Sequence, residues 1–250
     1  MFDVHLASFI YIINIMGIKK KIKRIYNEHI INKKYGKFKT TIVIKKNWDK
    51  ININRIALIN LAISNFLKKN KTCNYLEIGC DDNFVFNSII LPTKFKIGID
   101  PRKGGNYKIK SDNFFKINKK KFDVIFVDGL HHYEQCQRDV INSLNCLNKD
   151  GYLFIHDLLP LDWKMELVPR IQGRWNGDVW KVGYELSRSK SLKFHIADMD
   201  SGVGFLKKTS NKFIYNKIDA LKNLRFVDYL KIYKQLPIVE AEKALRMIGK

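Results

Sequence analysis

Side chains that accept protons or bind ions follow four short apolar runs of the sequence. The four ends carry Glu77 with Gly79, Asp100, Asp128, and His156 with Asp157. An acidic residue in such a place often only caps the next helix, so each one alone is a weak indication of function. If the runs are neighbouring parallel strands, their carboxyl ends lie along one edge of a sheet, where such sheets bind their ligands. The pattern therefore predicts one ligand site built from several strand ends.

The turn after the first run distinguishes between two cofactor classes. Gly79 lets the backbone approach a ligand without a Cβ clash, and Asp100, 21 residues later, can accept hydrogen bonds from both ribose hydroxyls of an adenosine. Those features suit NAD or S-adenosylmethionine. The turn reads GCDDN over residues 79–83 rather than GxGxxG, and its carboxylates, Asp81 among them, would repel a pyrophosphate. Because the ammonium and sulfonium groups of S-adenosylmethionine are positive, we expect that cofactor.

Two of the run ends could hold a divalent metal ion. Asp128, His156 and Asp157 would supply two carboxylates and one imidazole, which leaves coordination positions for substrate oxygens. Carboxylates favour Mg or Mn, and the histidine shifts the balance towards Mn, Fe or Zn. The alternative is that Asp128 caps its loop and His156 is an ordinary core histidine. We expect one ion, Mg or Mn.

Two adjacent histidines are candidates for a general base. Transfer of a methyl group from a sulfonium needs mainly alignment of the acceptor, but an acceptor hydroxyl must also lose its proton. His131 is the preferred base, next to Asp128 as the second catalytic residue, and His132 is the less favoured choice. The alternative is that both histidines only pack in their loop or face solvent.

The periodicity of the sequence predicts the elements that must position these residues. Expected strands are 74–79, 95–100, one near 107–110, 122–129 and 151–157; expected helices are 53–69, 84–90, 111–115 and 133–147. The strands are continuously apolar and alternate with helices, which is typical of sheets buried on both faces. We therefore expect an α/β fold with a doubly wound, mostly parallel, Rossmann-like sheet.

The sequence resembles the class I S-adenosylmethionine-dependent methyltransferases. The stretches that carry the resemblance are, in order, YLEIG, IGIDP, SDNFF, FDVIFVDGLHHYEQCQRDV, LNKDGYLFIHDLLP, WNGDVWK and DMDSGVGFLKK. They cover roughly residues 48–208, and FVDGLHHYEQ with the later HD is the most specific part. The placing of carboxylates after the fourth and fifth strands is similar to that in catechol-type, macrolide-sugar and cephalosporin-pathway O-methyltransferases.

The resemblance implies roles for individual residues. Glu77 and Gly79 would border the methionine moiety of the cofactor, Asp100 would hold the ribose, and Ser111 with Asp112 would border the adenine. Asp81 and Asp128 would complete the cofactor site. One departure is that the first motif of the family commonly carries more glycines than Gly79 alone.

Two flanks surround the expected catalytic domain of residues 48–208. Residues 1–47 form a basic N-terminal extension whose apolar run, 4–18, is 15 residues long. That run is shorter than the roughly 20 residues that span a membrane, and its lysines follow rather than precede it, unlike a signal peptide. We expect a helix packed on the core or on a partner subunit, with an interfacial amphipathic helix as the alternative. Residues 209–250 are expected to form a helical C-terminal extension.

The formal net charge of +22 at first suggests nucleic acid as a partner. Of the 46 basic residues, 37 are Lys and 9 are Arg, and the flanks 1–50 and 207–250 carry +9 and +7 of the charge. Proteins that read nucleic acids favour Arg for bidentate contacts and place aromatic residues beside it. We therefore expect no specific nucleic-acid binding. Peripheral membrane contact through the basic flanks and a homo-oligomer stay open.

These observations favour a cytoplasmic methyltransferase that acts on a small molecule, such as a hydroxyl of a sugar or related metabolite. The four cysteines include no CxxC pair, which fits a reducing compartment. One alternative is a membrane-surface or interaction module that retains the fold. Another is an NAD-type dehydrogenase or epimerase, which the acidic first turn and the lack of a Tyr-x-x-x-Lys-like dyad in the matching region disfavour.

Overall fold

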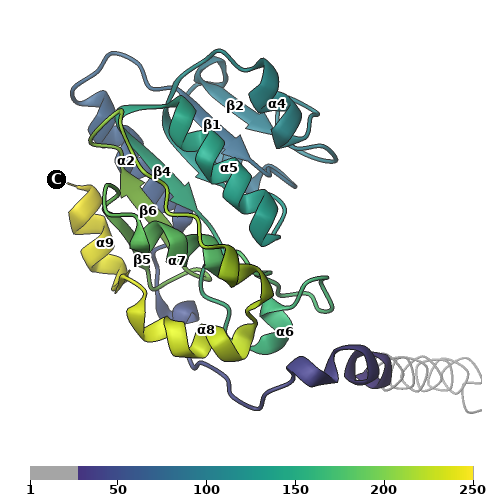
Figure 1. Cartoon of the computed structure of the whole chain (residues 1–250). Coiled ribbons are helices and arrows are strands. Elements are labelled where there is room, and N and C mark those ends of the chain that lie inside the picture. Colours follow the sequence, from purple (N-terminus) through teal and green to yellow (C-terminus); the bar gives the residue numbers. More distant parts are fainter. Residues whose placement is uncertain (1–27, 250) are drawn as a thin grey trace, which may run out of the picture. The chain divides into compact units, whose positions relative to one another are not determined.

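The computed structural model describes residues 28–249 of the chain (Figure 1). The chain divides into two compact units, with the boundary between Thr41 and Ile42. The described part of the first unit is helical over residues 28–35 and ends in a 3₁₀ turn, η1 (Gly36–Phe38). The expected apolar helix of residues 4–18 lies outside the described residues. Among the described residues, no helix is both long and apolar enough to cross a membrane.

The second unit is built on a single seven-stranded sheet. Its strands are β1 (Tyr75–Ile78), β2 (Lys96–Ile99), β3 (Phe122–Val127), β4 (Leu147–Ile155), β5 (Phe194–Ala197), β6 (Val203–Lys207) and β7 (Ile238–Val239). Their order across the sheet is β2-β1-β3-β4-β6-β5-β7. All neighbours are parallel except β6, which runs antiparallel to both β4 and β5. The predicted doubly wound, mostly parallel sheet is confirmed.

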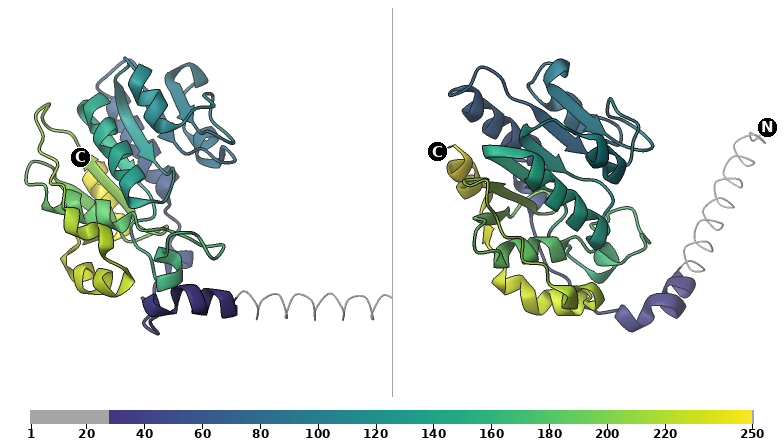
Figure 2. Two further views of the ribbon diagram at one scale, coloured as in Figure 1. Left: turned by 45° about the vertical axis from the view of Figure 1, so that its right-hand side comes forward. Right: turned by 45° about the horizontal axis from the view of Figure 1, so that its top comes forward.

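Helices cover both faces of this sheet. They are α2 (Arg55–Leu67), α3 (Phe84–Ser88), α4 (Ser111–Ile117), α5 (Tyr133–Cys146), α6 (Trp163–Glu166), α7 (Trp180–Arg188), α8 (Phe226–Ile232) and α9 (Ala241–Ile248). α2 contacts α9, whereas α5 contacts α4 and α7, and both α2 and α5 touch β3 and β4. Figure 1 shows α5 in front of the sheet and α2 behind it, and Figure 2 gives two further directions.

Burial on both faces explains the composition of the central strands. All six residues of β3, FDVIFV, are buried, as are all four of β1. Such strands read as continuous apolar runs because neither side chain direction meets water. Each large apolar side chain so buried contributes about 1.5–3 kcal/mol to folding. The core therefore fixes where β1, β3 and β4 end, and with that the place of the residues that follow them.

The strand predicted near residues 107–110 is reduced to one bridge between Ile99 and Tyr107. The side chain of Asn106 takes the place of a neighbouring strand at the edge of β2. Its Oδ1 accepts from the Gly98 N–H at 2.8 Å, and its Nδ2 donates to the Lys96 carbonyl at 2.9 Å. Because those edge groups of β2 are already bonded, a regular ladder has no partners there.

The C-terminal residues are part of the second unit. Besides the expected helices, they supply β7, which pairs with β5 in parallel, and α9, which contacts α2 and β5. α9 carries Ala241, Ala244 and Ile248 as its buried residues, three and four positions apart. The C-terminal segment therefore closes the sheet at the edge farthest from β2.

Candidate active site

The carboxyl ends of β1, β3 and β4 lie at one edge of the sheet. The register pairs Ile78 with Val127, and Val127 with Ile155, so the residues that directly follow the three strands lie at the same edge of the sheet. Those next residues are Gly79, Asp128 and His156. The sequence pattern predicted this neighbourhood, and the register explains it.

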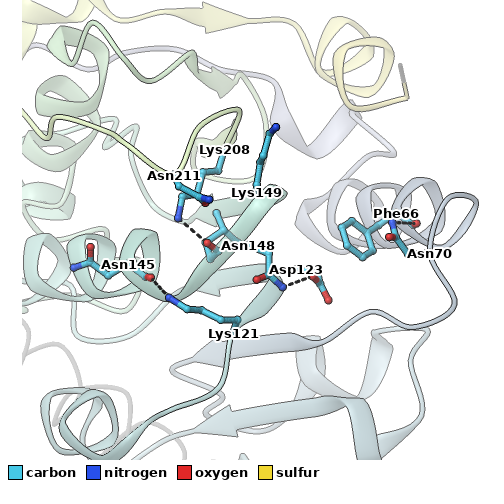
Figure 3. Close-up of a pocket in the computed structure, with 10 residues that line it drawn as sticks. Phe66, Asn70, Lys121, Asp123, Asn145, Asn148, Lys149, Lys208 and Asn211 are labelled. Carbon is cyan, nitrogen blue, oxygen red and sulfur yellow. Dashed lines mark hydrogen bonds between the residues drawn. The ribbon is translucent and has the colours of Figure 1, made fainter.

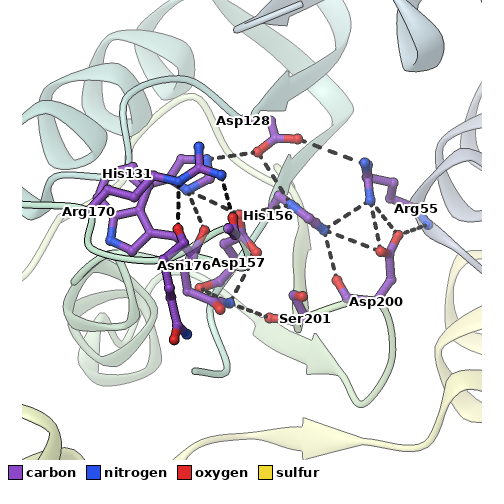
Figure 4. A network of polar contacts seen from close by, with 12 residues as sticks. Arg55, Asp128, His131, His156, Asp157, Arg170, Asn176, Asp200 and Ser201 are labelled. Carbon is purple, nitrogen blue, oxygen red and sulfur yellow. Dashed lines mark hydrogen bonds and ion pairs between the residues drawn. The ribbon is translucent and has the colours of Figure 1, made fainter. Parts of the chain in front are cut away.

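His131 and His156 each lie close to two carboxylates at this edge (Figure 4). His131 Nε2 is 3.4 Å from Asp128 Oδ1, and its Nδ1 is 3.3 Å from Asp157 Oδ2. His156 Nδ1 is 3.3 Å from the same oxygen of Asp128 and 3.2 Å from the same oxygen of Asp157. Four residues predicted as catalytic or metal-binding are thus brought together in one cluster.

The far side of the His156 ring is held by a backbone carbonyl. Its Nε2 lies 2.8 Å from the Asp200 carbonyl oxygen. Arg55 Nη1, which can only donate, lies farther from Nε2, at 3.2 Å. The shorter contact, to a carbonyl that can only accept, therefore favours a proton on Nε2 and a lone pair on Nδ1 in the neutral ring. Nδ1 is buried without a hydrogen-bond partner. It therefore faces the two carboxylates as a ligand or as a proton acceptor.

Electrostatic coupling shifts the pKa values of Asp128, His131 and His156. Burial alone would raise the pKa of Asp128, but His156 and His131 hold it well below its usual range. Burial alone would lower the pKa of His156, but Asp157 and Asp128 raise it well above its usual value, and the pKa of His131 is raised by Asp128 and Asp157 against its own burial. This coupling favours the charged forms of Asp128 and of both histidines.

Arg55 and Asp200 belong to this network, and neither was predicted from the sequence. Arg55 is the first residue of α2, directly after Asn54, whose side chain accepts from the Ala57 N–H. Its Nη1 lies 2.8 Å from each carboxylate oxygen of Asp200, and its Nε is 3.9 Å from Asp128 Oδ2. One signal was available, since Arg is rare among the basic residues of this Lys-rich chain. A guanidinium forms bidentate pairs that an ammonium cannot form.

Gly79 is required by the backbone of the neighbouring turn. Its φ is +86°, and a Cβ there would lie 2.2 Å from the Asp128 carbonyl oxygen. The turn after β1 thus lies against the turn after β3. From the sequence we explained this glycine by the close approach of a ligand, whereas the structure explains it by the close approach of a neighbouring turn. Asp81 follows in this turn, exposed, with a carboxylate oxygen 3.5 Å from Lys103 Nζ.

Asp100 is already occupied by backbone amides. Its Oδ1 accepts from the N–H groups of Arg102 and Lys103 at 2.8 and 2.9 Å, and its Oδ2 accepts from the Asp81 N–H at 3.1 Å. Burial alone would raise the pKa of Asp100, but these amides lower it. The carboxylate therefore orders the loop beside the first turn.

Glu77 lies within the sheet rather than on its edge. It is 1% exposed, and its Oε2 accepts from the Tyr75 hydroxyl at 2.6 Å. Burial raises the pKa of Glu77 to about 7. Its expected contact with a cofactor stays a prediction.

Ser111 and Asp112 face α5 at a separate place. Gln135 Nε2 donates to Ser111 Oγ at 3.1 Å and to Asp112 Oδ1 at 3.2 Å. Arg138 Nε donates to the same Asp112 oxygen at 3.3 Å. These contacts tie the start of α4 to the first turns of α5. The expected adenine contact of the two residues stays a prediction.

A pocket of about 600 Å³ lies at the opposite edge of the sheet, where β3 and β4 begin (Figure 3). None of the predicted site residues lines it. Its Lys121 Nζ donates to the Asn145 carbonyl, and Lys208 Nζ to those of Leu144 and Leu147, at 2.7, 2.8 and 2.7 Å. These cations satisfy carbonyl groups at the C-terminal end of α5, which is a structural role. The chemistry is thus concentrated at the other edge.

A comparison with protein families finds a match over part of the chain. Residues 99–158 match a family model described as a methyltransferase domain. This segment runs from the end of β2 to just beyond β4 and contains Asp128, His131, His156 and Asp157. No curated protein matches the chain in sequence.

Several solved structures are similar to this chain. A Podospora anserina methyltransferase bound to SAH is 16% identical, with a TM-score of 0.42 over 60% of this chain and 76% of the other. An O-methyltransferase from Bacillus cereus in complex with SAH is 11% identical, with a TM-score of 0.42 over 65% of this chain and 85% of the other. MycE, a methyltransferase of mycinamycin biosynthesis in complex with Mg, SAH and mycinamycin VI, is 15% identical, with a TM-score of 0.39 over 57% of this chain and 46% of the other.

Proposed function

We propose that this protein is an S-adenosylmethionine-dependent methyltransferase that methylates a hydroxyl of a small molecule, such as a sugar or related metabolite. The observation that carries the proposal is the cluster of Asp128, His131, His156 and Asp157 at the carboxyl edge of the sheet. All four residues lie within the segment that matches a methyltransferase domain.

The cofactor would bind across the ends of β1, β2 and β3. The exposed carboxylate of Asp81 favours a cationic ligand over a pyrophosphate. Asp100, at the end of the next strand, is the acceptor for the ribose hydroxyls, and Asp128 lies next to Gly79 at the end of the third. In this arrangement Glu77, within β1, borders the methionine moiety of the cofactor, and Ser111 and Asp112 border its adenine.

His131 is the general base of the proposed reaction. Its Nδ1 faces two acceptors, the Trp175 carbonyl at 3.1 Å and Asp157 Oδ2 at 3.3 Å, whereas Nε2 faces one, Asp128 Oδ1 at 3.4 Å. The neutral ring therefore favours a proton on Nδ1 and leaves Nε2 to accept one. The hydroxyl of the acceptor gives its proton to Nε2 while its oxygen attacks the methyl group of the sulfonium in line. Asp128 and Asp157 stabilise the imidazolium that forms, as carboxylates do beside catalytic histidines.

The donor set also fits a divalent ion. The buried Nδ1 of His156 has no hydrogen-bond partner and lies next to two carboxylate oxygens, while a backbone carbonyl holds its other nitrogen. Asp128, His156 and Asp157 would hold Mg or Mn. His131 offers an alternative third ligand, since one ligand atom from each of Asp128, His131 and Asp157 lies within 4.8 Å of the others. A bound ion would lower the pKa of the acceptor hydroxyl.

The proposal is tested by incubating the protein with methyl-deuterated S-adenosylmethionine and a panel of sugars, glycosides and catechols. Mass spectrometry should detect a product that carries the deuterated methyl group. The variant His131→Ala should bind the cofactor and fail to form that product. Formation of the product at the wild-type rate by His131→Ala would contradict the assigned base, and a reduced nicotinamide product from NAD would contradict the reaction class.

A further inference from the structure

Four consecutive residues, Trp175–Asp178, contact the proposed base or its neighbours. This segment is part of the WNGDVWK stretch and lies in the loop between α6 and α7. The backbone N–H groups of Asn176 and Gly177 both donate to the Met165 carbonyl at 3.0 Å, which anchors the segment to α6. The sequence pattern assigned no chemistry to it.

Trp175 makes two contacts with His131. The two rings are stacked, with centroids 5.1 Å apart and an interplanar angle of 22°. The Trp175 carbonyl also accepts from His131 Nδ1, at 3.1 Å. The indole itself is held by its Nε1, which donates to the Leu167 carbonyl at 2.7 Å. Trp175 thus holds the plane of the imidazole and, together with Asp157 Oδ2 at 3.3 Å, favours the proton on Nδ1.

Asn176 holds Asp157. Its Nδ2 donates to the carboxylate oxygen Oδ1 of Asp157 at 3.0 Å and to the Asp157 carbonyl at 3.1 Å. The other carboxylate oxygen, Oδ2, is therefore the one that faces His131 and His156. Asp157 has a φ of +63°, an uncommon conformation for a residue with a side chain. Asn176 is fully buried, so this amide is a fixed part of the site.

The last two residues of the segment bring it close to the loop of His131. Gly177 has a φ of +65°, and a Cβ on it would lie 1.8 Å from the His131 carbonyl oxygen. Asp178 Oδ1 accepts from the Tyr133 N–H, at the first residue of α5, at 2.7 Å. Side chains larger than hydrogen are therefore excluded at residue 177, and the segment fits against residues 131–133.

We propose that Trp175–Asp178 is a positioning element, in which Trp175 sets the tautomer and plane of His131 and Asn176 sets the orientation of Asp157. This inference rests on the proposed function only where it gives these contacts a role in catalysis. Trp180, the other tryptophan of the stretch, is fully buried in the core, so it offers no surface on which a ligand could stack.

The first experiment measures the tautomer of His131 by ¹⁵N NMR of histidine-labelled full-length protein, at a pH where the ring is neutral. The signal is assigned by its loss in His131→Ala. Wild-type protein should show the Nδ1–H form, whereas an unconstrained histidine in water prefers Nε2–H. Trp175→Leu keeps the backbone carbonyl but removes the indole, whose stacking on His131 and bond to the Leu167 carbonyl hold residue 175 in place, so it should shift the signal towards the Nε2–H form. Trp175→Phe, which keeps a stacked ring, should retain the wild-type signal.

The second experiment measures the affinity of the full-length protein for Mn²⁺ by calorimetry. Outer-shell partners of metal ligands commonly change affinity by about 10–100-fold, so Asn176→Ala should weaken Mn²⁺ binding by at least about tenfold. Asn148→Ala is the matched control, because Asn148 Nδ2 also donates to a carboxylate oxygen, that of Asp123 at 2.7 Å, at the opposite edge of the sheet. It should change the affinity by less than about threefold.

Two results would overturn this inference. One is a wild-type His131 in the Nε2–H form, and the other is a folded Trp175→Leu variant with the wild-type tautomer. If Asn176→Ala does not fold, the two Trp175 variants still decide. All variants are also titrated with S-adenosylmethionine, and they should keep the wild-type affinity for this cofactor. A failure of the positioning role is thereby distinguished from a failure of the proposed function, in which the wild-type protein itself would not bind the cofactor.

Discussion

The Nε2 atom of His156 lies 2.8 Å from the backbone oxygen of Asp200. This contact favours a proton on Nε2 and leaves Nδ1 buried, without a partner, beside two carboxylates. In a metal-binding histidine, the remaining ring nitrogen usually donates to a carbonyl or carboxylate in this way. The relationship between these two residues is the strongest structural reason to test for an ion.

We predict that the protein binds one Mn²⁺ ion at the Asp128 cluster. Asp157→Ala should abolish binding measured by calorimetry, because it removes an anionic ligand that both histidines face. The same variant should keep its affinity for S-adenosylmethionine within about threefold, which corresponds to less than about 1 kcal/mol. Asp123→Asn, at a buried carboxylate on the opposite edge, is the control and should leave Mn²⁺ binding intact.

The histidine variants identify the third ligand. If His156 supplies it, His156→Ala should lose Mn²⁺ and His131→Ala should retain it; the reverse result assigns His131. If the ion takes part in catalysis, a chelator should abolish methyl transfer to the true acceptor, and Mg or Mn should restore it. Turnover that is unaffected by chelation would refute a catalytic ion, and His131 would then be the sole activator of the acceptor.

We predict that Asp100→Ala lowers the affinity for S-adenosylmethionine by at least about tenfold, since each charge-assisted hydrogen bond to a ribose hydroxyl is worth about 1.5–3 kcal/mol. Asp82→Ala is the matched control, because Asp82 accepts one backbone N–H, that of Phe84 at 2.9 Å, without a proposed ligand role. Calorimetry measures both variants, and their melting temperatures show whether the loop of Asp100 stays folded. An unchanged affinity of a folded Asp100→Ala would remove the ribose assignment.

The stability of the protein should fall as the pH rises from about 4.5 to about 7. Glu166 is 1% exposed, and burial raises its pKa from 4.5 to about 7. In that range the folded state binds more protons than the unfolded state, so the free energy of unfolding decreases with pH. A shift of this size corresponds to about 3 kcal/mol, at about 1.4 kcal/mol for each pH unit.

The variant Glu166→Gln tests this dependence. Denaturant unfolding should show a shallower fall in stability with pH than in the wild type, and the variant should be the more stable protein at pH 8. Glu242→Gln changes an exposed carboxylate of α9 and should follow the wild-type curve. Parallel curves for all three proteins would show that Glu166 is ionised in the folded state throughout.

Deletion of residues 1–40 should leave the cofactor affinity within about threefold of the wild type. The boundary between the two compact units falls next to this point, at Thr41. If the basic flank docks on anionic membranes, the same deletion should abolish liposome association, which in the full chain should weaken with salt because exposed charges are screened over about 10 Å at 0.1 M. Salt-insensitive, sequence-selective DNA binding by the full chain would contradict this interpretation of the charge.

The sequence was informative where chemistry follows directly from a buried strand. The continuous apolar pattern predicts that two segments, FDVIFVD and GYLFIHD, are buried strands with polar residues at their ends. The register of β3 and β4 brings those ends together. Arg55, Asn176 and Asp200 reach the same site from a helix start and from loops, where hydrophobic periodicity carries no information. Asp200 at φ +46° and Asp157 at +63° adopt backbone conformations that no composition rule predicts.

Binding of S-adenosylmethionine is the most direct test of the proposed function. Calorimetric titration of the full-length protein with S-adenosylmethionine, its demethylated product SAH, and NAD should give micromolar dissociation constants for the first two and at least about hundredfold weaker binding for NAD, a difference of about 2.7 kcal/mol. Tighter binding of NAD, or no binding of either methyltransferase ligand by a folded protein, would contradict the account.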